Sequence, residues 1–108
     1  MRGKWFKNSK IEELIRSILE DLLGSNSLQA FEYHLEKAID GEDLYTTFWK
    51  HPGKFYAALE NLFGPGAETF LRLIAHKLAA ERYLAVKPEE FVSVFKLGRG
   101  KIEELFKL

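Results

Sequence analysis

Residues 67–84 read AETFLRLIAHKLAAERYL, and this stretch decides the fold class. When the segment is projected at about 100° per residue, its apolar positions cover most of a helical circumference. The apolar positions are Ala67, Phe70, Leu71, Leu73, Ile74, Leu78, Ala80 and Leu84. A polar strip of Glu68, Arg72 and His76 repeats every four residues between them. We therefore expect a nearly all-round apolar helix at the centre of a helical bundle.

The composition outside this stretch also favours helices. Sixteen Leu and nine Ala stand against three Val, six Ile and three Thr, and this excess favours helix over strand. Gly and Pro fall where the apolar periodicity breaks, so they mark the helix ends. We predict an all-α fold, a single compact bundle of about five to six helices. The expected helices are 10–23, 25–39, 44–49, 52–63, 67–84 and 88–97, and residues 101–108 form a last helical segment.

Two of these segments need a separate argument. Ser9 followed by Glu12 forms a capping box that predicts a helix start near residue 10. Residues 88–97 fit either a helix or a strand, and we favour the helix because no partner strand is predicted elsewhere.

The chain has 108 residues and 12.5 kDa, which suffices for one hydrophobic core. We predict a flexible basic leader at 1–9 and a single helical domain at 10–108. No segment approaches the roughly 20 apolar residues that a membrane span needs, which predicts a cytoplasmic protein without membrane contact. The formal net charge is zero, which argues against a dedicated nucleic-acid binder.

The sequence shows no complete catalytic or metal-binding pattern. Three His occur without the His-Glu-x-x-His spacing of a zinc site, and Cys is absent. Gly98-Arg99-Gly100-Lys101 resembles the end of a phosphate-binding loop but lacks its leading Gly and its Ser or Thr. We therefore expect no catalytic residues, no metal and no cofactor.

Segment 45–56 is rich in aromatic residues. Either a small domain cannot bury them all and some form an interface, or they cap the core beneath a loop. Trp and Tyr commonly anchor interfaces. We predict a non-enzymatic interaction module that forms a homodimer or binds an unknown protein partner. The predicted interface consists of Tyr45, Phe48, Trp49 and Tyr56.

Two alternative functions remain open. The first is a nucleic-acid-associated protein that contacts phosphates through basic residues, namely Lys4, Lys7, Arg99 and Lys101. The second is a small-molecule sensor with an interhelical pocket near Tyr33, His34 and His76.

Residues 22–84 also carry motifs that suggest a family. The motifs are Leu23-Gly24-Ser25, Phe31-Glu32-Tyr33-His34-Leu35-Glu36, Pro52 with Phe55, Ala58-Leu59-Glu60 and Phe63-Gly64-Pro65-Gly66-Ala67-Glu68 leading into Leu71 and Ile74. With them this region resembles a small archaeal family of uncharacterised all-α domains, sometimes called the Nitrosopumilus output-domain family. The resemblance implies an archaeal source and a role as the output or interaction end of a signalling system. It supplies no catalytic residues.

Overall fold

The structure is a computed structural model that describes residues 2–98 and 102–107, and the side chains of residues 10–98 and 102–107. Over these residues the chain forms only helices, turns and one isolated β-bridge, which confirms the all-α prediction. The elements are α1 (Arg2–Leu23), α2 (Ser25–Ala38), α3 (Leu44–Lys50), α4 (Pro52–Phe63), α5 (Gly66–Ala80), α6 (Pro88–Leu97) and a 3₁₀ turn, η1 (Ile102–Leu105).

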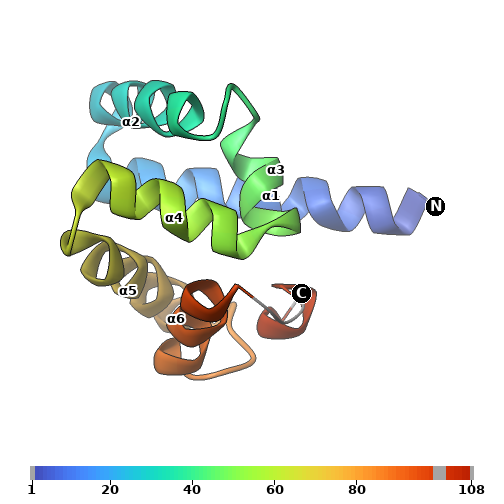
Figure 1. Cartoon of the computed structure of the whole chain (residues 1–108). Coiled ribbons are helices and arrows are strands. Elements are labelled where there is room, and N and C mark those ends of the chain that lie inside the picture. Colours follow the sequence, from blue (N-terminus) through green and yellow to red (C-terminus); the bar gives the residue numbers. More distant parts are fainter. Residues whose placement is uncertain (1, 99–101, 108) are drawn as a thin grey trace.

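The first helix is longer than predicted, because α1 begins at Arg2 and Ser9 lies inside it. No Pro interrupts residues 2–9, so nothing in this stretch prevents the helical hydrogen bonds from extending past the capping-box pattern. The helix ends at Leu23. The next residue, Gly24, has φ +84° and donates its N–H to the Glu20 carbonyl at 2.8 Å. The α2 helix starts at the next residue and runs back over α1 (Figure 1).

The middle of the chain follows the prediction closely. The short helix predicted after Gly41 is α3, which Asp43 caps by accepting the Thr46 N–H at 2.9 Å. Pro52 is the first residue of α4, as predicted, and the helix ends at Phe63 before Gly64. The α4 helix contacts α2, α3, α5 and α6, so it lies at the centre of the bundle.

The α5 helix ends at Ala80, four residues before the predicted end at Leu84. Arg82 takes a positive φ of 65°, and the Tyr83 N–H returns to the Leu78 carbonyl at 2.9 Å. This geometry is the Schellman motif that closes many helices. The buried positions of α5 are Ala67, Leu71, Ile74, Ala75 and Leu78. Leu73 faces outward and is half exposed, so the apolar surface of α5 is not covered on every side.

The ambiguous segment 88–97 is the helix α6, which confirms the favoured alternative. Gly98, the residue after this helix, takes a left-handed conformation and lies against Gly53 at the start of α4. A Cβ added to Gly53 would lie 2.9 Å from the Gly98 Cα, so only glycine at residue 53 lets the two backbones approach this closely.

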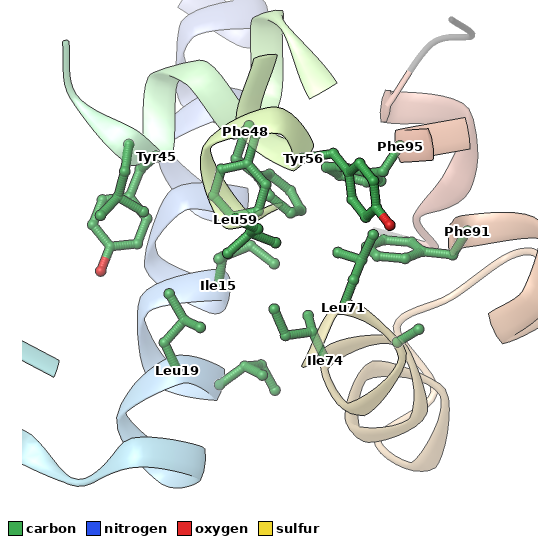
Figure 2. Close-up of a cluster of buried hydrophobic side chains, with 14 of the residues drawn as sticks. Ile15, Leu19, Tyr45, Phe48, Tyr56, Leu59, Leu71, Ile74, Phe91 and Phe95 are labelled. Atoms are coloured by element: carbon green, nitrogen blue, oxygen red, sulfur yellow. The ribbon is translucent and has the colours of Figure 1, made fainter. Parts of the chain in front are cut away.

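One hydrophobic core connects all the helices. Figure 2 shows its centre, where Phe48 and Leu59 lie between side chains of α1 and the Phe91 and Phe95 rings of α6. The last segment closes this region, because Phe106 pairs with Leu84 in the β-bridge and its ring lies 6.5 Å from that of Phe48. The predicted last helical segment is thus a short 3₁₀ turn whose apolar side chains complete the core.

Candidate functional site

Three of the four aromatic residues predicted as an interface lie in the core. Tyr45, Phe48 and Tyr56 are 8%, 1% and 9% exposed, while Trp49 is half-buried against the core. One copy of the chain thus buries these rings apart from Trp49. Phe48 does so within a cluster of aromatic rings from α3, α4, α6 and the tail. A contact surface has to be sought elsewhere.

The buried Tyr45 makes a polar contact with α2. The Tyr45 hydroxyl donates to a Glu32 carboxylate oxygen at 2.5 Å. Burial, and next the hydrogen bond to Glu32, raise the pKa of Tyr45 far above its usual range. The neighbouring Leu44 N–H donates to Glu36 at 3.2 Å. Two carboxylates of α2 therefore hold the start of α3.

The predicted small-molecule pocket is not assembled as expected. A hollow of about 280 Å³ lies between α2 and α4, lined by His34, Lys37, Ala38, Asn61 and Leu62. It includes His34 but is not lined by Tyr33 or His76. Tyr33 is exposed on α2, with its ring edge-on to that of His34 at 5.2 Å between centroids, and His76 is exposed on α5.

The predicted phosphate contacts lie outside what the structure describes. Arg99 and Lys101 are not among the described residues, and neither are the side chains of Lys4 and Lys7.

A basic hollow of about 400 Å³ does lie beside Gly98, lined by Lys50, His51, Pro52, Gly53 and Lys54. This hollow was not predicted, although the sequence Lys-His-Pro-Gly-Lys at residues 50–54 places its basic residues close together. Lys54 is already paired with Glu42, so part of this positive charge is neutralised within the chain.

A different surface stands out at the corner between α4 and α5. We call it the corner face, and it consists of Leu62, Phe63, Phe70 and Leu73. Leu62, Phe63 and Leu73 are 37%, 38% and 50% exposed. The Phe63 and Phe70 rings lie 4.9 Å apart, and Leu73 follows Phe70 by one helical turn, so they are neighbours on the surface.

The buried Phe31 of α2 packs against both aromatic rings of the corner face. Its ring is 6% exposed and lies 6.1 Å from Phe63 and 5.5 Å from Phe70. The three rings come from three helices, so the aromatic part of the face is fixed by packing.

Charged residues border the corner face, but its four side chains are all apolar. Residues 25–31 and 61–67 are two runs of seven residues, and neither contains a charged side chain. Two ion pairs of α5 flank Leu73. Arg72 directly precedes it and pairs with Glu68 at 2.6 Å, and Lys77 follows it by one turn and pairs with Asp21 at 3.5 Å. A surface that is apolar and uncharged at its centre has the composition of an interface core.

The sequence indicated in part that α5 carries an exposed apolar surface. The apolar positions of residues 67–84 covered more of a helix than its neighbours could bury, and Leu73 is the large side chain left outside.

Within the described residues, no three His, Asp or Glu side chains are placed to hold a metal ion. None of the described helices is long and apolar enough to cross a membrane. Comparisons of the chain with protein-family models, curated proteins and solved structures found no match.

Proposed function

We propose that this protein is a non-enzymatic helical interaction module that contacts another protein through the corner face. The observation that carries the proposal is the aromatic pair Phe63 and Phe70 with the half-exposed Leu73 beside it. Contiguous apolar patches on the surface of a monomeric protein often mark a site that binds another protein.

A comparison of the two ends of α4 supports this role. Figure 1 shows α4 running from the side of α3 and the C-terminal segment to the corner with α5. At its first turns, Phe55 belongs to an aromatic cluster that Phe106 helps to cover. At its last turn, Phe63 belongs to a second cluster that no described segment covers. A partner would supply the missing cover.

The resemblance to an archaeal output-domain family agrees with this role, since an output domain acts by contacting other proteins. The family assignment stays a prediction. It adds a signalling context to the proposal but no residues.

The proposal is tested with an immobilised protein and a cell extract of its source. Leu73→Glu places a charge on the corner face, while Leu97→Glu is a matched control, because Leu97 is 66% exposed on α6. We expect the original protein and Leu97→Glu to retain the same proteins, and Leu73→Glu to lose them. Equal retention by all three would show that the corner face is not the contact surface.

A second candidate function, the small-molecule sensor, is favoured by the hollow at His34. Its wall combines three polar side chains, His34, Lys37 and Asn61, with the apolar Ala38 and Leu62. A thermal-shift screen of small polar metabolites is the test. A compound that raises the melting temperature of the original protein but not of His34→Ala would support this function, and no such compound would count against it.

A further inference from the structure

We infer that the hollow between α2 and α4 binds a carboxylate group that is attached to a small apolar group. The inference rests on the second candidate function, the small-molecule sensor, because it names the ligand class of the same hollow. It does not depend on the corner face as a contact surface.

The walls of the hollow provide both kinds of contact that such a ligand needs. The side chains of His34, Lys37 and Asn61 can donate hydrogen bonds, while Ala38 and Leu62 offer apolar surface. The volume of about 280 Å³ lies near the lower end of ligand pockets, so the ligand has few atoms. Because α2 and α4 pack against each other (Figure 1), the bundle fixes the distance between the two walls.

Lys37 brings a positive charge to the hollow that no carboxylate of the protein neutralises. None of the ion pairs in the described part of the chain includes Lys37. Its ammonium lies 5.6 Å from the centroid of the Tyr33 ring, which is a cation–π contact. An aromatic ring carries no net charge, so the ammonium can still attract an anion.

Tyr33 also orders the polar wall of the hollow. Its ring meets the His34 ring edge-on, with 5.2 Å between the centroids, and the same ring contacts the Lys37 ammonium. Two of the three polar side chains are therefore positioned before a ligand arrives, which reduces the entropy lost on binding. Tyr33 thus supports this site although it does not line the hollow.

The acidic side chains closest in sequence are directed elsewhere. Glu32 and Glu36 of α2 accept hydrogen bonds from the first two residues of α3, so both face that helix. Glu60 of α4 lies about 200° around the helix from Leu62, and Asp40 lies beyond the end of α2. The described lining contains no carboxylate, so a carboxylate ligand would meet Lys37 without a competing acid on the wall.

The balance of charge favours a carboxylate over a phosphate. Lys37 is the only side chain of the described lining that is always charged near neutral pH. One positive charge matches the single negative charge of a carboxylate, whereas a phosphate monoester carries about two. The apolar side chains of Ala38 and Leu62 suit a short hydrocarbon group attached to that carboxylate.

The test is a titration of the ¹⁵N-labelled full chain with hexanoate, followed by two-dimensional NMR. Hexanamide, which has the same hydrocarbon chain but no charge, is the control ligand. We expect hexanoate to shift the amide signals of residues 34–38 and 58–62, with a dissociation constant on the order of millimolar for so small a ligand. Hexanamide should bind about 10-fold more weakly or not at all.

Two variants separate this site from general attraction to positive charge. Lys37→Gln removes the charge at the hollow, and Lys87→Gln removes the charge of an exposed lysine just before α6. Lys37→Gln should raise the dissociation constant for hexanoate about 10-fold, while Lys87→Gln should leave it unchanged. Both lysines are exposed, so circular dichroism melts of the two variants should match that of the original protein.

Three results would overturn the inference: hexanoate that shifts no signal of the hollow, hexanamide that binds as tightly as hexanoate, and equal weakening by both lysine variants. In each case, a neutral or cationic compound whose thermal shift depends on His34 would leave the sensor function standing. A screen without any such compound would remove the sensor function as well.

Discussion

Replacement of Phe48 by Ala should lower the free energy of unfolding more than the same replacement of a surface aromatic residue. Phe48 is 1% exposed, and its ring centroid lies 5.2 Å from Phe55, 4.9 Å from Phe95, 6.3 Å from Phe91 and 6.5 Å from Phe106. The Phe48→Ala variant leaves a cavity between α3, α4, α6 and the tail. These elements cannot all move inward at once, so the cavity is expected to stay open.

The expected loss follows from this geometry. Replacement of a fully buried Phe by Ala lowers the free energy of unfolding by about 3–5 kcal/mol. A domain of this size has a total stability of about 5–15 kcal/mol, so the variant would keep only part of it. With a urea dependence of about 2 kcal/mol per molar, the midpoint of unfolding should fall by about 2 M. Urea titrations followed by far-ultraviolet circular dichroism measure this shift.

Phe63→Ala is the matched control, because it removes the same atoms from a ring that is 38% exposed. We expect a loss of about 1–2 kcal/mol there, since less buried surface and fewer contacts disappear. If Phe48→Ala lowered the stability no more than Phe63→Ala, the assignment of Phe48 to the core would be wrong. The predicted aromatic interface would then regain its basis.

Three further outcomes test other parts of the fold. Gly53→Ala should lower the melting temperature, because its Cβ would lie 2.9 Å from the Gly98 Cα and push α4 away from α6. We expect the free energy of unfolding to fall by about 1–3 kcal/mol. Tyr45 has a raised pKa in the folded state, so its stabilising contribution is complete below about pH 10 and is lost at higher pH. Tyr45→Phe, which lacks the hydroxyl bonded to Glu32, should therefore show a smaller alkaline loss of unfolding free energy than the original protein. Asp43→Ala should remove about 1 kcal/mol in a thermal melt, because the start of α3 loses its cap.

The sequence predicted helices best where Pro or Gly fixed their ends. Helix 52–63 was predicted at both ends because Pro52 suits a first helical position and Gly64 ends the periodicity. The end of α5 was missed because Arg82, neither Gly nor Pro, takes the positive φ that closes the helix. The start of α1 was missed because the pattern at Ser9 fits the inside of a longer helix as well as a cap.

The candidate site could not be predicted to the same degree, because helical periodicity does not show which faces meet. The burial of Phe48 depends on Phe106, which is 58 residues away, and on a tail that crosses back to Leu84. With most aromatic residues of segment 45–56 buried, the corner face is a place in the described chain where two aromatic rings in contact stay partly exposed. Its position follows only from the packing of α2, α4 and α5.

This separation of the two aromatic clusters has a consequence for function. The α4 helix contributes Phe55 to the covered cluster and Phe63 to the open one, so stability and the proposed contact would depend on different ends of one helix. Phe48→Ala should then lower the free energy of unfolding and leave the capture of partner proteins by the folded fraction unchanged. Leu73→Glu should weaken this capture and leave the free energy of unfolding unchanged, because half of that side chain is already in water. If both variants changed both measurements together, the proposed contact would not be separable from folding.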